Sequence, residues 1–266
     1  MSIKICLAGA SGHVGSELVQ AIIEEDDLKL TAAVGRTTAG LNLGSVLGIE
    51  EIDIPIRASV EESLPTGWDV LVDYTTPAAV KGNVKSAING GRHAVVGTSG
   101  LTDEDYHGIN QSALAQAVGV MAAGNFSITA TLMQHFALVA ARHVPTWEIL
   151  DYAPDTKPDA PSGTARELAF QLGRVAQPDW AVPVEETKGL KDSRGAELNG
   201  SQIHSIRIPG FYSSAEVMFG LPGERLSLRH DSMSYQPYVA GTLLAIRKVE
   251  TFTGLRRGLA AIMDLG

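Results

Sequence analysis

The chain has 266 residues, 44% of them hydrophobic, and a formal net charge of −9. This length allows two modest domains with buried cores. The acidic balance disfavours nucleic acid as a partner, because phosphate backbones attract basic surfaces. Since no apolar stretch approaches the about 20 residues of a membrane span, we also expect no membrane partner.

The single cysteine, Cys6, cannot form an internal disulfide, and residues 1–15 lack the basic start and cleavage site of a signal peptide. We therefore expect a cytoplasmic protein. The seven histidines show no close metal-ligand spacing and there is no cysteine pair, so no metal site is expected. No Gly-x-Ser-x-Gly motif accompanies Ser162, which disfavours a serine hydrolase.

The first segment has the pattern of a dinucleotide-binding fold. Residues 3–8 are apolar and predict a buried strand, and an amphipathic helix follows the glycine-rich loop 9–15. Glycines in such a loop allow the backbone to approach a pyrophosphate closely. The predicted cofactor contacts here are Gly9, Ser11, Gly12, His13, Val14 and Gly15. The alternative is a structural turn that binds no ligand.

The second predicted strand, residues 28–34, ends without an acidic residue. An NAD-specific site usually has an acid here, which takes the ribose hydroxyls and repels a 2′-phosphate. Arg36 can instead pair with that phosphate, and Thr37 can donate a hydroxyl. The sequence thus favours NADPH and leaves NADH use open. The alternative is a solvated surface arginine.

Three further predicted strands, at 69–74, 94–96 and 118–121, each run into small polar residues. In an open parallel sheet the ligand binds beyond the carboxyl ends of the strands, so we expect these loops beside the nicotinamide ring. The predicted cofactor residues in and next to them are Tyr74, Thr75, Gly97, Thr98, Ser99, Ala123, Asn125 and Phe126.

The pattern changes after a predicted helix at 127–142. Short apolar segments between 147 and 228 are separated by Pro-Gly turns, which favours antiparallel strands, and the tail at 237–248 and 254–264 is predicted helical. The predicted class is α/β. A Rossmann-type parallel-sheet nucleotide domain (1–126 and 231–266) is joined to an α+β domain for substrate binding and oligomerisation (127–230), whose sheet is mainly antiparallel.

The segment 157–165 places Lys157 six residues before Gly163, where an amphipathic helix is predicted to begin. A helix start exposes unpaired backbone N–H groups and the positive end of the helix dipole. Lys157, Ser162, Gly163 and Thr164 are therefore predicted to bind a small carboxylate. The alternative is an ordinary helix start, with a capping box at Thr164–Glu167.

These motifs, taken in order along nearly the whole chain, resemble the dihydrodipicolinate reductase family. The segments that carry the resemblance are Gly9-x-x-Gly12-x-x-Gly15, 72–77, 97–100, Asn125-Phe126-Ser127 and Lys157-x-Asp159-Ala160-Pro161-Ser162-Gly163-Thr164-Ala165. The resemblance implies hydride transfer from NADPH or NADH to a C=N or conjugated C=C–N bond of a small cyclic carboxylate. The family substrate is 4-hydroxy-tetrahydrodipicolinate. It also implies a homo-oligomer, usually a tetramer built through the substrate-domain sheets.

The chain departs from the family where a proton donor is expected. Family members carry a Glu-x-His-His-type motif, and its two histidines are replaced here by Ala153 and Pro154. Tyr235 stands at an arginine position, and the segment 212–216 lacks a Gly-Glu-His sequence. Because alanine cannot deliver a proton, we predict Lys157 and Tyr152 as catalytic residues, with Tyr212 or water as other donors.

Two alternatives to the family reaction follow from these departures. One is a same-fold NAD(P)H imine reductase or amine dehydrogenase with a less anionic substrate. The other is a catalytically inactive nucleotide-binding regulatory protein. The retained Lys157 and Ser162-Gly163-Thr164 favour an enzyme, because a decayed site has little physical reason to keep both a cation and an anion cradle.

Overall fold

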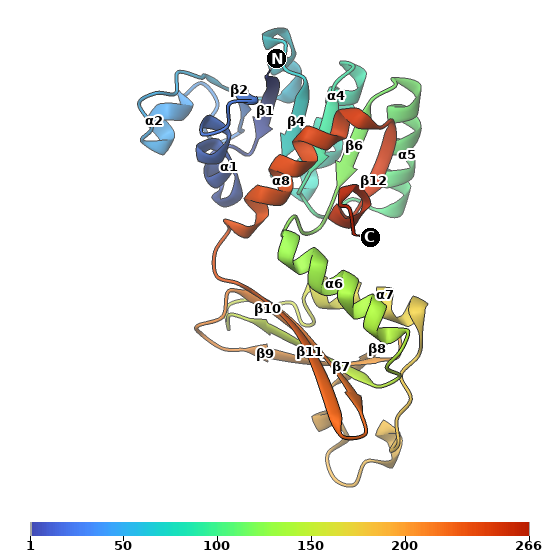
Figure 1. Cartoon of the computed structure of the whole chain (residues 1–266). Helices are drawn as coiled ribbons and strands as arrows, with labels where there is room; N and C mark the ends of the chain where they lie inside the picture. Colours follow the sequence, from blue (N-terminus) through green and yellow to red (C-terminus); the bar gives the residue numbers. More distant parts are fainter. Residues whose placement is uncertain (1, 266) are drawn as a thin grey trace. The chain divides into compact units, whose positions relative to one another are not determined.

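The computed structural model describes residues 2–265, which form two compact units (Figure 1). The first contains residues 2–128 and 235–264, and the second contains residues 129–234. We expected the chain to re-enter the first unit at residue 231. It does so four residues later because the last strand of the second sheet continues to Ser232.

The first unit is built on a seven-stranded sheet in the order β12-β6-β5-β4-β1-β2-β3, with every neighbouring pair parallel. Its strands are β1 (Ile3–Ala8), β2 (Leu28–Val34), β3 (Ile56–Arg57), β4 (Val70–Asp73), β5 (His93–Val96), β6 (Gly119–Ala122) and β12 (Gly254–Arg257). Its helices are α1 (His13–Ile23), α2 (Leu43–Leu47), α3 (Val60–Ser63), α4 (Pro77–Asn89), α5 (Asp103–Ala115) and α8 (Pro237–Lys248). Short 3-10 turns lie at η1 (Leu64–Thr66), η4 (Val249–Thr251) and η5 (Leu259–Ile262).

Helices cover both faces of this sheet because its strands are apolar on both sides. Along β1, Leu7 packs in a core cluster with Leu18 of α1 and Ile246 of α8. The next residue, Ala8, packs in a second cluster with helices α4 and α5. The buried thiol of Cys6 belongs to this second cluster. The Rossmann-type parallel sheet predicted from the sequence is confirmed.

The tail is the place where the predicted secondary structure is wrong. Residues 254–264 were expected to be helical, but they form β12 and η5. Strand β12 pairs with β6 at the edge of the sheet, and Gly254 has a left-handed φ of 84°. Pairing with a partner more than 130 residues away satisfies backbone groups that the local apolar spacing cannot reveal.

The second unit has a five-stranded sheet in the order β11-β10-β7-β9-β8, in which only the β7 and β9 pair is parallel. Its strands are β7 (Trp147–Ala153), β8 (Ala196–Leu198), β9 (Ser201–Arg207), β10 (Ser213–Leu221) and β11 (Glu224–Ser232). It also contains α6 (Ile128–Ala141, from its second residue on), α7 (Gly163–Val175), and the short turns η2 (Val184–Glu186) and η3 (Lys191–Arg194). The predicted mainly antiparallel sheet is confirmed.

Side chains of this sheet alternate between an apolar face and a polar face. Trp147 and Ile149 of β7 pack against α6 and α7 in one buried cluster. Glu148 and Tyr152 of the same strand point to the opposite face. There Glu148 accepts a hydrogen bond from Arg194, and Tyr152 donates one to Glu216. By the same alternation Asp151 lies on the helix-covered face, beside the start of α7.

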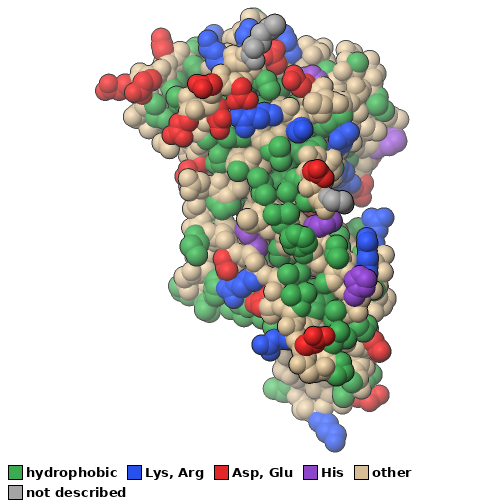
Figure 2. Space-filling model, viewed as in Figure 1, with side chains coloured by type: hydrophobic (Ala, Val, Ile, Leu, Met, Phe, Trp, Pro, Cys, Tyr) green, Lys and Arg blue, Asp and Glu red, His purple; other side chains and the backbone are tan. Residues whose placement is uncertain are grey.

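Charged side chains are dispersed over the surface seen in Figure 2. Lys and Arg side chains are scattered across this face, whereas acidic side chains gather around α2, at the upper left. This distribution agrees with the net charge of −9. No helix of residues 2–265 is long and apolar enough to cross a membrane, and these residues contain no cluster of His, Cys, Asp and Glu with the arrangement of a metal site.

Two helical glycines predict opposite effects of the same substitution. A Cβ atom on Gly241 of α8 would lie 1.9 Å from the carbonyl oxygen of Phe126, whereas Gly82 of α4 has open space around it. Gly82→Ala should raise the free energy of unfolding by about 0.5–1 kcal/mol through helix propensity. Gly241→Ala should lower it by about 2–3 kcal/mol through overpacking. Urea denaturation of both variants checks the two signs, and a stabilised Gly241→Ala protein would contradict this packing.

Candidate cofactor and substrate sites

The glycine loop between β1 and α1 forms a cradle that side chains would fill. Gly9 has a φ of 85°, and a Cβ atom there would lie 2.1 Å from the carbonyl oxygen of Tyr74. A Cβ atom on Gly15 would lie 2.1 Å from the carbonyl oxygen of Gly9. Gly12 is the N-cap of α1, makes no side-chain cap, and precedes a first turn without acidic residues. The cradle thus fits a pyrophosphate held by backbone N–H groups.

The end of β2 lies next to this cradle. The hydroxyl of Ser11 is 3.4 Å from the hydroxyl of Thr38. Arg36 and Thr37, between that contact and the end of β2, are exposed. The structure therefore places the loop after β2 beside the glycine loop through Ser11 and Thr38. His13 is exposed, and its ring stacks on the ring of Tyr235 at 4.8 Å between centroids.

A buried carboxylate joins the loops that follow β4 and β5. Asp73 is fully buried, and its Oδ1 accepts hydrogen bonds from the hydroxyls of Thr75 (2.7 Å) and Thr98 (2.6 Å). Its Oδ2 accepts one from the side chain of Asn83 at 2.7 Å. The backbone N–H of Thr75 also donates to Thr98 Oγ1 at 2.7 Å. The predicted cofactor residues Thr75 and Thr98 are thus held side by side.

The sequence analysis did not predict a role for Asp73. Its position, at the end of an otherwise apolar strand and shortly before two threonines, could have indicated one. Its four hydrogen bonds use donors from two loops and a helix. This carboxylate fixes the carboxyl-end edge of the sheet on the side where a nicotinamide ring is expected. Ser99, in the same edge, is exposed.

The side chains of Tyr74 and Phe126, both predicted to contact the cofactor, pack in the first core cluster. The hydroxyl of Tyr74 lies 2.7 Å from that of Thr242, and its ring occupies the space beside Gly97. Burial raises the pKa of this phenol. Phe126 is 1% exposed, and its ring lies 6.2 Å from the Tyr74 ring. Their side chains support the edge of the sheet from within.

The loop after β6 is also tightly held. Ala123 is buried, and its N–H donates to the carbonyl oxygen of Val96. Asn125 accepts a hydrogen bond from the N–H of Ser127 at 2.8 Å through its side-chain oxygen. The backbone here is therefore preformed, and it lies on the same edge as the loops after β4 and β5.

In the second unit, α7 begins at Gly163 with Ser162 as its N-cap. Ser162 Oγ accepts from the N–H of Ala165 at 3.3 Å, and the first turn contains no acidic residue. The capping box considered at Thr164–Glu167 is wrong, because the helix starts earlier than that pattern requires. Gly163 is exposed with open space around it, as an anion-binding helix start requires.

Lys157 lies in the loop before α7 and is already paired. Its ammonium is 2.8 Å from Asp159 Oδ1, and both side chains are more than a third exposed. This hydrogen bond from Lys157 keeps the pKa of Asp159 below its ordinary value. A carboxylate ligand of Lys157 must therefore compete with, or share, the pairing to Asp159.

The structure does not bring Tyr152 to the start of α7. The Tyr152 hydroxyl donates to Glu216 at 3.2 Å, and the guanidinium of Arg229 lies 4.8 Å above its ring. Burial and the neighbouring carboxylate of Glu216 raise the pKa of this phenol. Tyr152 is on the polar face of the sheet, whereas its neighbour Asp151 bonds the backbone N–H of Ser162. The two predicted catalytic residues therefore have different partners: Tyr152 contacts Glu216 and Arg229, whereas Lys157 pairs with Asp159.

Ala153, at the position where the family resemblance puts a histidine, is 1% exposed. Its carbonyl oxygen accepts from the N–H of Ile208. The methyl group supplies no proton donor. Tyr212, the other phenol considered as a donor, lines a separate cavity with Phe211, Arg229 and Asp231.

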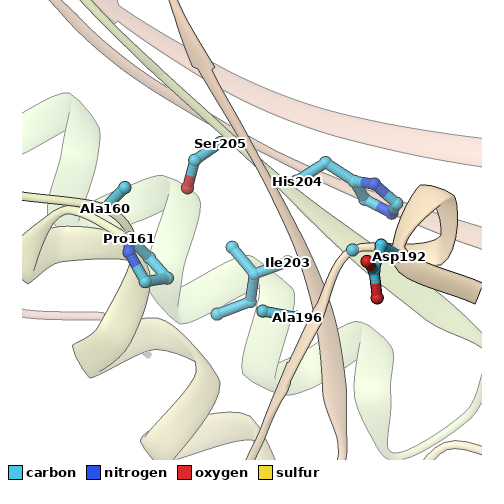
Figure 3. Close-up of a pocket in the computed structure, with 8 residues that line it drawn as sticks. Ala160, Pro161, Asp192, Ala196, Ile203, His204 and Ser205 are labelled. Atoms are coloured by element: carbon cyan, nitrogen blue, oxygen red, sulfur yellow. The ribbon is translucent and has the colours of Figure 1, made fainter.

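A groove of about 610 Å³ runs beside the loop that precedes α7 (Figure 3). Ser205 lies at the end near Ala160 and Pro161, Ile203 lies in the middle, and His204 and Asp192 lie at the other end. This volume is within the range of small-molecule sites. The groove adjoins the predicted carboxylate-binding loop.

The chain combines a parallel sheet that has a glycine cradle at its first helix with a second, mixed-sheet unit, and this is the organisation of NAD(P)H-dependent oxidoreductases. Comparison with known proteins gives the family. Residues 3–126 match the family model for the N-terminal part of dihydrodipicolinate reductase, and residues 129–264 match that for its C-terminal part. The chain belongs to the dihydrodipicolinate reductase family.

Individual relatives agree along the full length. A 4-hydroxy-tetrahydrodipicolinate reductase from Halalkalibacterium halodurans is 39% identical over 98% of this chain and 100% of its own. One from Listeria welshimeri is 35% identical with the same coverage. The solved structure of a dipicolinate-bound dihydrodipicolinate reductase from Paenisporosarcina sp. TG-14 has a TM-score of 0.87 at 31% identity, covering 99% and 100% of the two chains. An amine dehydrogenase from Mycobacterium smegmatis, at 13% identity and a TM-score of 0.67, shares the fold.

The buried carboxylate of Asp151 predicts an acid-sensitive part of stability. Burial opposes its ionisation, but hydrogen bonds from Ser162 and Arg207 outweigh this and hold its pKa below the ordinary 3.8. Because the folded pKa is depressed, this stabilisation is present above pH 3.8 and is lost as the pH falls through the folded pKa. Urea unfolding between about pH 5 and pH 2 should show a shallower loss of stability for Asp151→Asn than for the wild type. Equal acid slopes would contradict the assignment.

Proposed function

We propose that the chain is a reductase that transfers a hydride from NADPH to a C=N or conjugated C=C–N bond of a small cyclic dicarboxylate. The substrate of its named relatives, 4-hydroxy-tetrahydrodipicolinate, is the first candidate. The observation that carries the proposal is the start of α7, where an open helix N-terminus follows a loop containing Lys157. Backbone N–H groups, the Ser162 and Thr164 hydroxyls and one ammonium are the groups that bind a carboxylate.

The nicotinamide cofactor supplies the hydride when it is bound. The residues of the first unit orient it: the cradle at Gly9, Gly12 and Gly15 takes the pyrophosphate, and the loops fixed by Asp73 take the nicotinamide end. Hydride transfer depends mainly on such positioning and on electrostatic stabilisation. In the second unit, Lys157 holds and polarises the substrate and is the proposed proton donor, with water as the alternative.

A less anionic imine substrate is the second candidate function. It is favoured by Ala153 and Tyr235, which stand where the family resemblance puts a histidine and an arginine. Assays of NADPH oxidation with 4-hydroxy-tetrahydrodipicolinate and with a panel of cyclic monocarboxylate imines separate the two. Turnover of the dicarboxylate on the order of 10 s⁻¹ supports the family reaction. Turnover of a monocarboxylate imine alone supports the second candidate, and turnover of neither supports an inactive regulatory protein.

The same assays define the role of the missing histidine. If the family reaction needs a protein acid at that position, Ala153→His should raise turnover of the dicarboxylate, provided the buried site admits the ring. Ordinary turnover by the wild type would show that Lys157 or water suffices.

We further propose a cytoplasmic homo-oligomer, a tetramer as the family resemblance implies. The polar face of the second sheet carries half-buried apolar side chains, among them Leu150 and Met218, between its charged groups. Mass measurement in solution tests the oligomeric state.

Arg36 carries the proposed preference for NADPH. Charge-assisted hydrogen bonds to a phosphate are worth about 1.5–3 kcal/mol, so Arg36→Ala should weaken NADPH binding roughly tenfold to a hundredfold and NADH binding much less. Titration calorimetry of both cofactors gives the two losses. Equal losses would remove Arg36 from the 2′-phosphate site.

Lys157 carries the proposed substrate contact. Lys157→Met should reduce turnover at least about a hundredfold and leave NADPH affinity within about twofold, because its partners are in the second unit. Lys188→Met, which removes an exposed lysine from the same unit, is the matched control and should keep both properties. Normal turnover by Lys157→Met would place the substrate elsewhere.

A further inference from the structure

A buried ion pair lies beneath the loop that leads into α7. Asp151 is 1% exposed, and its Oδ2 accepts hydrogen bonds from Arg207 Nη2 at 2.7 Å and from the backbone N–H of Ser162 at 2.8 Å. Ser205 adds a third hydrogen bond, through its hydroxyl, at 3.2 Å. One carboxylate oxygen thus contacts both strand β9 and the N-cap of α7.

Arg207 holds the other end of the same loop. Its Nη2 donates to the carbonyl oxygen of Asp159 at 2.8 Å, and its Nη1 donates to the carbonyl oxygens of Asp151 and Ile206. The segment 159–162 is therefore fixed at its first residue by Arg207 and at its last residue by Asp151. Lys157 lies two residues before Asp159, and α7 begins directly after Ser162.

The ion pair also determines the charge next to the proposed carboxylate site. An ionised carboxylate this deeply buried is costly unless a cation pairs with it. Here it also lies one hydrogen bond away from Ser162, where a substrate carboxylate is proposed to bind. Unpaired, Asp151 would repel that anion across a poorly screened distance. The guanidinium of Arg207, whose side chain is 16% exposed, cancels this charge.

We infer that Arg207 is a positioning residue of the carboxylate site, which it keeps receptive to a dicarboxylate by neutralising Asp151 and fixing the loop 159–162. This inference rests on the proposed function. It gives the two partners opposite roles for binding, because removing the arginine exposes a negative charge whereas removing the acid deletes one. A pair that is only structural would make both removals harmful to the same degree.

The test measures binding of dipicolinate, the ligand of the solved relative, to full-length protein by titration calorimetry. Arg207→Met should weaken dipicolinate binding at least about tenfold, as expected for an uncompensated nearby charge. Asp151→Asn should stay within about threefold of the wild type or bind more tightly. The double variant should recover to within about threefold, because both charges are gone. NADPH affinity should remain within about twofold throughout, since its proposed site is in the first unit.

Arg194→Met is the matched control. It removes the same guanidinium charge from the same unit, but Arg194 lies in η3 and pairs with Glu148 on the polar face of the sheet. It should leave dipicolinate affinity within about twofold of the wild type. Thermal denaturation of every variant separates lost stability from lost binding.

Equal weakening by Arg207→Met and Asp151→Asn, with no recovery in the double variant, would overturn the inference and leave the pair a structural one. Should Arg207→Met fail to fold, the double variant and Asp151→Asn decide, because a structural role predicts weak binding for both. Lys157→Met separates this result from the proposed function. If that variant also binds dipicolinate normally, the carboxylate site itself is wrong. If only Lys157→Met weakens binding, the site stands without the role of Arg207.

Discussion

Two helix starts without acidic residues in their first turns are the feature on which both proposed anion sites of this molecule depend. Helix α1 is capped by Gly12, which has no side chain, and α7 by Ser162, and neither helix has an acidic first turn. Helix α5 contrasts with both, since its capping box at Thr102 and Asp105 and its three acidic residues complete that end. These are the two helix ends at which a pyrophosphate and a carboxylate are proposed to bind.

Each unit also contains a buried carboxylate that fixes backbone near its proposed site. Asp73 holds the loops beside the first, and Asp151 bonds the backbone of the second. The two acids differ in how they are compensated. Asp73 is surrounded by hydroxyl, amide and backbone donors, whereas Asp151 has the guanidinium of Arg207. A buried carboxylate can be compensated by several converging hydrogen-bond donors or by a paired cation, and this chain uses both.

The elements that could be predicted from the sequence are those determined by neighbouring residues. The strand, glycine loop and helix of the first segment, the parallel order of the next strands and the helix after Ser162 were all readable from apolar spacing and glycine positions. Strand β12 was not, because its strand character comes from pairing with β6 far along the chain. The buried ion pair of Asp151 was not predictable, since its cationic partner Arg207 lies 56 residues away in the sequence. The face of the second sheet on which Tyr152 lies could not be predicted either, because it depends on how β7 pairs with β10.

The pairing of Lys157 with Asp159 gives the site a built-in competitor. Because the ammonium already has an anionic neighbour 2.8 Å away, a ligand gains only the difference between its own contact and the one it displaces. The neighbour is tethered two residues along the chain, so its local concentration is high and does not vary with that of the ligand. A ligand with one weak anionic group gains little from this exchange. If the start of α7 binds a carboxylate, as proposed, a ligand with two acid groups can replace the internal pair and still contact the helix start, so the Lys157–Asp159 pair would favour ligands with two acid groups over ligands with one.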